Sequence, residues 1–521
     1  MSDTPEEVDA PFSFGVTVAF TLNYIIGTGF LTLPWGFNQT GNVLGVTTLG
    51  IMTMFAISAA LLMLEAMARA EAYANQTNNF GSFMGDNPVT TYKSLLPISL
   101  RNDSQQFVSL KITKTDNNMI RNAKPVSEFH VVGNQKYEVT ELCKIFLGKQ
   151  SVRVYTFLIS VYMYGTLWAY ATVFADSLAM RLPLNPTGNS TVVSSASYGM
   201  YLLLFAMIVV PSSLIELSEQ IYVQVTLSIC RVLMLVLMVG TITHAIWLQN
   251  EDIKNGRGNI SQPFGPLTRV TTDYSIRDDP LNMNKLYLLL PMAAYATIFH
   301  HSIPSISQPV KDKMQLGRIF TTTLVLCFVA YITMAIVIAN YFGNETLISS
   351  NLDWEFYWGQ LNSNREIPLY ARCISSFVVL LPALDVASAF PLNAITLGNS
   401  LMSAYYGSKI HVLGINESRR SRIIFRIIAA VPPLFAASLV SDLGTITHFA
   451  GVSGFAIAFI FPSLLAIFSR RLLTNHGLPY KTHYSCWLTS RPVCVLSIII
   501  GLFLIIFVVT SLLVIGPPPA K

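Results

Sequence analysis

A Gly-Thr-Gly sequence interrupts the first long apolar stretch of the chain, residues 13–38. In a bilayer, each backbone N–H or C=O group that loses its helical partner costs several kcal/mol, so such a break is tolerated where the backbone lines a cavity. The N–H groups that begin the outer half of a broken helix can bind a carboxylate, and the carbonyl groups that end its inner half can face a cation or an ammonium group. We therefore expect Gly27, Thr28 and Gly29 to bind a substrate and the Asn23 side chain to bind a coupling ion.

A second interruption is predicted in the sixth apolar stretch, at a pair of histidines that precedes Pro304. Proline removes a backbone donor and disfavours helix in the residue before it, which predicts an unwound segment at 299–303. Adjacent histidines cannot share one helix face, so at most one faces the site, where it either carries protons or hydrogen-bonds a carbonyl group. Further ligands for zinc are missing. The residues expected to line the substrate site here are Phe299, His300, His301 and Ser302.

Two further residues inside apolar stretches are candidates for the site. Asp385 lies within 368–396, and a charged carboxylate at the centre of a bilayer costs about 2.5–3.5 kcal/mol, so it is usually paired, protonated or functional. We expect it to couple a proton or sodium ion; the alternative is a structural ion pair with a neighbouring helix. Tyr162 is expected to wall the substrate pocket, with ordinary packing as the alternative. The alternatives for the residues of the first stretch are a tight helix crossing at the two glycines and a bridge between helices at Asn23.

The elements that must position these residues are membrane-spanning helices. Of the 521 residues 52% are hydrophobic and 12% are charged, about half the charge of a soluble domain, and the mean hydropathy is +0.50. These values predict an all-α polytopic membrane protein. Eleven stretches are long and apolar enough to span. They are approximately 13–38, 43–69, 153–181, 198–217, 221–248, 284–308, 318–342, 368–396, 423–440, 446–468 and 492–515.

The distribution of basic residues predicts the orientation, because cytoplasmic loops collect Lys and Arg. The loops that share a side with a cytoplasmic N-terminus hold Lys311, Lys313, Arg318, Lys409, Arg419, Arg420, Arg422, Arg426, Arg470, Arg471, Lys481 and Arg491. The net charge of +5 therefore needs no nucleic-acid partner. The predicted segments are a cytoplasmic N-terminus (1–12), two spans (13–69), a cytoplasmic insertion (70–152), nine spans (153–515) and a short luminal or extracellular C-terminus (516–521). The acidic start lacks the basic region of a cleavable signal peptide.

Three Asn-x-Ser/Thr sequences fall in predicted outside loops and are candidate glycosylation sites: Asn189, Asn259 and Asn344. Together with the spans they predict a multi-pass protein of the endolysosomal or plasma membrane. The six cysteines lack metal-ligand spacing, and we expect no structural disulfide.

The polar part of the insertion, residues 70–136, is either a disordered cytosolic loop or a docking element for a cytosolic partner. Two segments with alternating apolar residues, 108–112 and 129–132, could form a small hairpin. From Glu138 to Lys149 the chain becomes amphipathic, which predicts a short helix on the inner membrane surface.

Several of these motifs resemble the amino acid/auxin permease family. The first-helix pattern of Asn23, Gly27 and Gly29 matches that family, and His300 with Pro304 is similar to its sixth helix. The segment 137–148 resembles its amphipathic stretch. Further motifs look like an orphan branch of the family: Glu65-Ala-Met-Ala, Tyr164-Gly-x-Leu-x-x-Tyr170 and His301-Ser-Ile-Pro-Ser-Ile.

The resemblance implies a LeuT-like fold with helices 1–5 and 6–10 as inverted repeats and one added helix. It also implies transport of small amino acids with protons or sodium, and a role for Asn23 in holding sodium. Two features depart from the family. The eighth-helix Thr that would complete a sodium site has no clear counterpart, while Asp385 appears nearby, which favours protons. The external cysteine pair of several members is also missing.

The sequence thus predicts a secondary active transporter of small amino acids, with neutral ones favoured, and no resident cofactor. The alternative is an amino-acid sensor that binds its ligand with little flux and signals through 70–152. An enzyme is not expected, because no nucleophile and base can be assembled and no phosphate-binding glycine-rich loop is present. A channel is disfavoured because no ring of pore-lining charges is evident.

Overall fold

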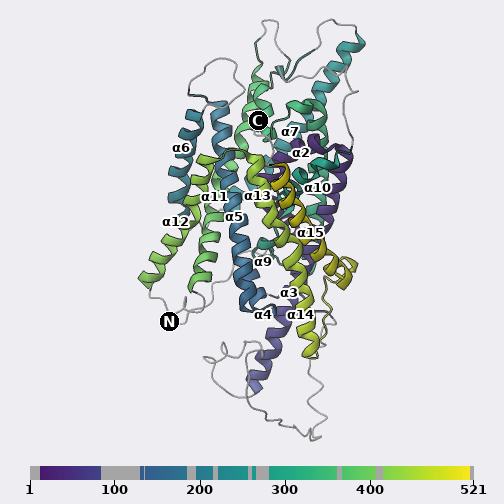
Figure 1. The fold of residues 1–521 in the computed structure, drawn as a ribbon, viewed down its shortest axis with the longest axis vertical. Helices are drawn as coiled ribbons and strands as arrows, with labels where there is room; N and C mark the ends of the chain where they lie inside the picture. The colour runs from purple at the N-terminus through teal and green to yellow at the C-terminus, as the bar shows by residue number, and fades with distance from the viewer. Residues whose placement is uncertain are drawn as a thin grey trace.

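Long helices run side by side along the longest axis of the molecule in the computed structural model (Figure 1). The structure describes residues 12–83, 129–133, 135, 137–184, 195–214, 221–255, 261–265, 281–360, 366–406 and 415–516. Within these residues all named secondary-structure elements are helices, and β-pairing is confined to two isolated bridges. The long unbroken helices are α3 (Asn42–Phe83), α5 (Lys149–Arg181), α6 (Ser195–Leu214), α7 (Ile221–Lys254), α10 (Leu316–Phe342), α11 (Leu369–Tyr406), α12 (Ile415–Leu439) and α15 (Arg491–Ile515).

Two helices near the C-terminus form one continuous helical segment. A π-helical segment, Ala456–Ile460, connects α13 (Leu443–Phe455) to α14 (Phe461–Asn475). With that pair counted once, ten helices of the described residues are long and apolar enough to span a membrane, and one bent pair raises the number to eleven. Each falls on one of the eleven predicted stretches, so the predicted all-α polytopic class is confirmed.

Both predicted interruptions are present. The first stretch forms α1 (Phe14–Ile25), a 3-10 helix (Gly29–Thr32) and α2 (Leu33–Thr40), with a bend of 55° across the break. The sixth forms α8 (Leu286–Thr297), a 3-10 helix (His300–Ser302) and α9 (Ile303–Ser307). The backbone leaves helical geometry at Ile298 and Phe299. The unwound segment therefore begins one residue before the predicted 299–303 and is shorter, because 300–302 form the 3-10 helix and α9 begins at Ile303.

The two broken helices are built in the same order. Each has a 12-residue α-helix, a short unwound segment, a 3-10 turn and a second α-helix that carries proline in its first two positions. Pro34 and Pro304 are these residues. Proline suits the start of a helix because its missing N–H has no intrahelical acceptor there, and it cannot continue a helix from the preceding segment. The prolines therefore restart each helix after its break.

Hydrogen bonds define two polar ends of the bundle. The Phe12 end joins the start of α1 to the segment after α9, because the Phe12 N–H donates to Pro309 O at 2.8 Å. At the opposite end the Asn282 N–H donates to Thr40 O at 3.1 Å, and the Asn42 amide donates to Asn340 Oδ1 at 2.9 Å. The broken helices α1–α2 and α8–α9 consequently run antiparallel, and their breaks lie between the two ends.

Several predicted features can be placed on these ends, and others lie outside the described residues. Asn344 is exposed and lies at the Thr40 end, where its Oδ1 accepts from the Asn38 amide at 3.4 Å. The other two predicted glycosylation sites, Asn189 and Asn259, lie outside the described residues. So do 84–128, residues 1–11 and 517–521. A cytoplasmic N-terminus stays a prediction.

The last part of the insertion packs against the Phe12 end of the bundle. Helix α4 (Val139–Phe146) is capped by a reciprocal pair of side-chain bonds, with Glu138 accepting from the backbone of Glu141 and Glu141 accepting from the backbone of Glu138. Its residues Val139, Leu142, Cys143 and Phe146 are buried, and the helix packs against α5, α3 and α14. Figure 1 shows α4 beside these helices at one end of the bundle. The predicted hairpin partner 108–112 lies outside the described residues, so the hairpin stays a prediction. His130 forms a β-bridge with Thr482 in the connection before α15.

Candidate functional site

The break in the first helix lies against the last turns of α8. The Thr28 and Tyr295 hydroxyl groups are 3.2 Å apart, and both side chains are buried. A Cβ atom added at Gly27 would meet only the Tyr170 hydroxyl, at 3.9 Å, so the space in front of Gly27 is open. The unwound backbone at Gly27 and Thr28 thus faces phenol groups from α5 and α8.

Gly29 has a different environment from Gly27. A Cβ atom there would lie 2.7 Å from Tyr295 Cδ1 and 3.0 Å from the backbone of Ala296. Real Cβ contacts are not this short, so only glycine allows the first helix to approach α8 so closely. The structure places Gly29 in a tight helix crossing, and Gly27 beside open space.

The two histidines of the second break point in different directions. The His300 ring is buried, and its Nε2 lies 3.0 Å from Ala56 O in α3. The His301 ring instead packs edge-on against Tyr162, with ring centroids 5.6 Å apart. Tyr162 also contacts Tyr295, with centroids 5.9 Å apart. His301 therefore belongs to the aromatic group beside the first break, whereas His300 fastens the second break to α3.

Some polar atoms of the second break make no hydrogen bond within the protein. Among the described residues, His301 Nδ1 is buried and has no hydrogen-bond partner, and the same is true of His300 Nδ1. Ser302 is partly buried and follows His301 in the 3-10 turn, and the Phe299 ring packs against Phe320 and the His300 ring. A buried nitrogen with no partner costs about 1–3 kcal/mol, which a bound polar molecule would recover. We define the group Gly27, Thr28, Tyr162, Tyr170, Tyr295 and His301 as the break site.

Asp385 does not join the break site directly. It forms a buried ion pair with Arg231 of α7, whose second terminal nitrogen, Nη1, donates to Asn23 O at 2.7 Å. Arg231 thus brings together the two residues predicted to hold a coupling ion, through the Asn23 main chain. Arg231 is not among the residues predicted from the sequence. The signal was present, because an arginine inside the fifth apolar stretch, 221–248, calls for a buried acid in another helix.

A buried network of charged side chains lies at the Phe12 end of the bundle. Glu65 of α3 accepts from Arg69 on its own helix and from Arg470 of α14, with the Arg470 contact at 2.8 Å. The Ser485 hydroxyl donates to the second oxygen of the same carboxylate at 2.6 Å. Glu65 and Arg69 are fully buried. The network fixes α3, α14 and the connection before α15 to one another.

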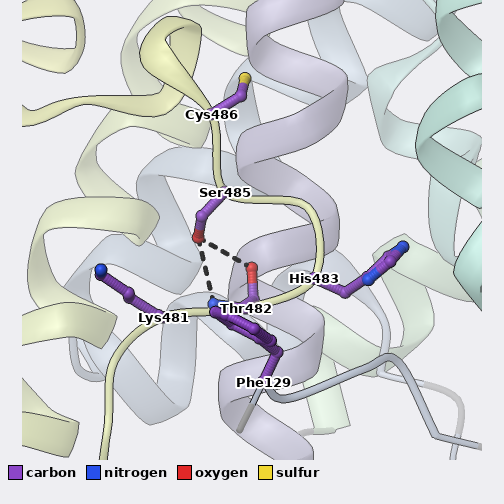
Figure 2. Close-up of a pocket in the computed structure, with 6 residues that line it drawn as sticks. All are labelled: Phe129, Lys481, Thr482, His483, Ser485 and Cys486. Atoms are coloured by element: carbon purple, nitrogen blue, oxygen red, sulfur yellow. Dashed lines mark hydrogen bonds between the residues drawn. The ribbon is translucent and has the colours of Figure 1, made fainter.

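The connection before α15 also holds the end of the insertion. The His483 N–H donates to His130 O at 2.9 Å, and the His130 ring lies 2.8 Å from Pro479 O. An open hollow of about 350 Å³ lies beside this contact. Figure 2 shows the side chains that line it. Its lining residues are Phe129, Lys481, Thr482, His483, Ser485 and Cys486. We call the paired segments 129–133 and 479–484 the latch; Ser485 connects it to Glu65.

A metal centre is not evident in the part of the chain that the structure describes, where no three His, Cys, Asp or Glu side chains cluster suitably. Asp176, an acid inside the third predicted apolar stretch, is half-buried in α5 near Asp442. Asp442 itself caps α13 by accepting from the Thr445 N–H at 2.7 Å.

No family model matches the sequence. The chain is 24% identical over 501 residues to the transmembrane protein 104 homolog of Dictyostelium discoideum, covering 91% of this chain and 92% of that protein. It is 23% identical over 479 residues to transmembrane protein 104 of Homo sapiens, covering 88% of each. The Drosophila melanogaster homolog is 24% identical over 549 residues, covering 95% of this chain and 98% of that protein. These relatives share one name.

The chain is thus similar over most of its length to proteins named transmembrane protein 104. Since relatives named as transmembrane proteins align over most of the chain and the helices are long and apolar, the protein is a multi-pass integral membrane protein. Membership of the wider amino acid/auxin permease family stays a prediction.

Among solved structures, two mutants of a manganese transporter from Eremococcus coleocola each align with 98% of this chain and 97% of their own. The TM-scores are 0.44 and 0.45, at 11% and 10% identity. A likeness at this level assigns neither substrate nor ion to this chain.

Proposed function

We propose that the protein is a secondary active transporter of small neutral amino acids, driven by a proton or sodium gradient. The observation that carries the proposal is the contact between two antiparallel broken helices, at Thr28 and Tyr295, in the interior of the bundle. Interrupted helices at membrane depth are costly unless their freed backbone groups serve a binding site, and this is how secondary transporters hold substrates between their repeats.

An amino acid fits the break site by its chemistry. Its carboxylate would accept from the N–H groups that begin the segment 29–40, which have no intrahelical acceptor. Its side chain would lie against the aromatic rings, and the open space at Gly27 suits a small one. A neutral side chain is favoured, because the nearby charged residues Arg231 and Asp385 already neutralise each other.

The matching construction of the two broken helices supports a LeuT-like inverted repeat. Helix α1 starts at the Phe12 end and α8 at the Thr40 end, and each breaks after 12 residues. In such a fold, alternating access would rock one set of helices against the rest around the fixed breaks. Four helices pack together on one side of the molecule: α5, α6, α11 and α12 (Figure 1). We infer that they move as one unit.

The test is uptake of a labelled amino-acid mixture into proteoliposomes that contain the full chain, with a pH gradient or a sodium gradient imposed separately. Gly27→Val should abolish accumulation by filling the open space. Gly15→Val is the matched control on the same helix, because a Cβ atom at Gly15 meets nothing within 4 Å. No accumulation of any amino acid by the wild-type protein under either gradient would reject the proposal.

A second candidate function, an amino-acid sensor, is favoured by one specific connection. Helix α3 contacts the second break through Ala56 and His300, and it contacts the latch through Glu65 and Ser485. A ligand that moves His300 could therefore shift the cytoplasmic insertion through α3. Deleting residues 84–128 separates the functions: a transporter keeps its uptake, whereas a sensor keeps ligand binding and loses its downstream signal.

A further inference from the structure

The break in the first helix exposes the Asn23 carbonyl group. In a continuous helix this oxygen would accept from Gly27 N–H, but that N–H donates to Ile25 O instead, at 2.9 Å. The last carbonyl groups of any helix lack intrahelical donors and form the negative end of its macrodipole. The carboxyl end of α1 therefore presents partial negative charge inside the bundle.

Neighbouring helices supply donors along α1. The Ser228 hydroxyl of α7 donates to Ala19 O in the middle of the helix at 3.3 Å, and the Tyr331 hydroxyl of α10 donates to Ile25 O at its carboxyl end at 3.3 Å. The Asn23 carbonyl, which has lost its helical donor at the break, accepts a hydrogen bond from the positively charged guanidinium group of Arg231 at 2.7 Å.

The Arg231 guanidinium is fixed in this position. It is 5% exposed, and it bridges Asn23 O to the Asp385 carboxylate of α11, which is 7% exposed. Arginine cannot lose its proton in a protein, so the charge is permanent. A buried charge inside a membrane is costly and marks a functional position together with its partner.

We propose that Arg231 is a tethered cation, which occupies the place between Asn23 O and Asp385 where a free monovalent cation would otherwise bind. Carbonyl and carboxylate oxygens are the ligands that hard cations prefer, and here a side chain takes both. The chain supplies its own cation at the end of α1, and Na⁺ does not bind there in the wild-type protein. This inference concerns the coupling ion, so its meaning for transport rests on the proposed function.

The experiment measures Na⁺ binding to the purified full chain. Thermal unfolding is compared in NaCl and in choline chloride at equal ionic strength, together with equilibrium binding of radioactive Na⁺. The wild-type protein should unfold at the same temperature in both salts. Arg231→Ala leaves the carbonyl and carboxylate oxygens without a cation, so Na⁺ should raise its Tm with a saturating dependence on concentration.

Three variants serve as controls. Adding Asp385→Asn to Arg231→Ala should remove the Na⁺ response, because the carboxylate is lost. Arg231→Lys keeps a tethered cation and should behave as the wild type does. Arg181→Ala also frees a paired carboxylate, Glu355, but at the Thr40 end and without the helix break, so it should gain no Na⁺ response.

Na⁺-specific binding to the wild-type protein that Asp385→Asn abolishes would overturn the proposal. A folded Arg231→Ala protein without any Na⁺ response would overturn it as well. If Arg231→Ala does not fold, the wild-type and Arg231→Lys binding measurements still decide, since Na⁺ binding at Asp385 in either one contradicts a tethered cation and its absence in both supports it. The readout is ion binding, so a failure to transport amino acids would reject the proposed function and leave this result standing.

Discussion

The Thr28 and Tyr295 hydroxyl groups lie 3.2 Å apart although the residues are 267 positions apart in the chain. Each comes from one of the two broken helices, and both are buried. This contact joins the unwound backbone of the first helix to the last turn of α8 before its own break. A substrate that enters between the broken helices must meet or displace it.

Removing the Tyr295 hydroxyl should weaken substrate binding more than folding. In Tyr295→Phe the ring still packs against Tyr162, so the fold keeps its aromatic contact and loses the hydrogen bond with Thr28. One hydrogen bond is worth about 1 kcal/mol, which corresponds to roughly a five-fold rise in KM for uptake. Tyr287→Phe, a buried tyrosine nearer the start of α8, is the control and should leave KM unchanged. Equal effects from both variants would contradict a role of Tyr295 in binding.

Substitution by alanine should lower the stability of the protein at one glycine of the first break and not at the other. Gly29→Ala places a methyl group against the Tyr295 ring and the Ala296 backbone, and such overpacking costs about 1–3 kcal/mol. Gly27→Ala meets only one hydroxyl, at an ordinary 3.9 Å, and should leave the free energy of unfolding nearly unchanged. Thermal unfolding in detergent measures both. A Gly27→Ala protein as unstable as Gly29→Ala would show that the first break has no open space.

The adjacent histidines should separate into a structural and a binding residue. His300→Ala loses the contact with Ala56 O and leaves a void, so it should lower stability by at least about 1 kcal/mol. His301→Ala removes a ring that packs against Tyr162 in the break site and, in the described structure, makes no hydrogen bond to the backbone of another helix, so it should change KM more than Tm. Unfolding and uptake measured on the same preparations test this, and the reverse assignment would place His300 in the site.

The sequence was sufficient for the spans and for both breaks, because each follows from local chemistry. A run of apolar residues predicts a span, Gly27 and Gly29 weaken the first helix, and Pro304 weakens the sixth. Partners across the bundle could not be predicted in this way. Asp385 was visible as a costly buried acid, but its pairing with Arg231 depends on how α7 packs against α11 and α1.

Two residues of the same type that lie close together in the chain could not be assigned different roles from the sequence. Gly27 and Gly29 look equivalent in the chain, and so do His300 and His301. Their roles differ because Ala296 crowds one glycine and Ala56 O faces one histidine, and only the packed structure contains this information.

Asp353 should make the stability of the fold depend on pH. It is fully buried in the connection between α10 and α11, where its Oδ1 accepts from the Leu347 N–H at 3.1 Å. Burial raises the pKa of this carboxyl well above its ordinary value, and the Leu347 bond offsets only part of the shift. In the unfolded chain the carboxyl ionises near pH 4, whereas in the folded protein it keeps its proton to higher pH.

The free energy of unfolding should therefore fall as the pH rises from about 4 through the raised pKa, since the unfolded chain binds fewer protons over that range. Asp353→Asn keeps the shape and the Oδ1 acceptor without a charge, so its stability should decline less over the same range. Glu345→Gln, an exposed residue nearby, is the control. Identical pH profiles for Asp353→Asn and the wild type would contradict a protonated carboxyl in the folded protein.

Glu65 should be among the most sensitive positions for stability. Its carboxylate pairs with both Arg69 and Arg470, and Glu65→Ala would leave two buried guanidinium groups without their shared acid. Breaking a buried pair by removing one partner costs about 3–5 kcal/mol, because the remaining charge is not solvated. Glu355→Ala is the comparison: the Glu355 and Arg181 side chains are each 22% exposed, so water reaches the remaining charge and the loss of stability should be smaller than in Glu65→Ala.

The same substitution should release the latch, because Ser485 loses the acceptor that connects it to α3. Limited proteolysis of the intact protein should then cleave the segment 129–133 or 479–484 faster in Glu65→Ala than in Ser485→Ala, which keeps both arginines paired. If Ser485→Ala is cleaved as fast as Glu65→Ala while keeping its stability, the hydroxyl alone holds the latch. If neither is cleaved faster than the wild type, the latch is held by the backbone bonds between His130 and His483 and not by the charged network.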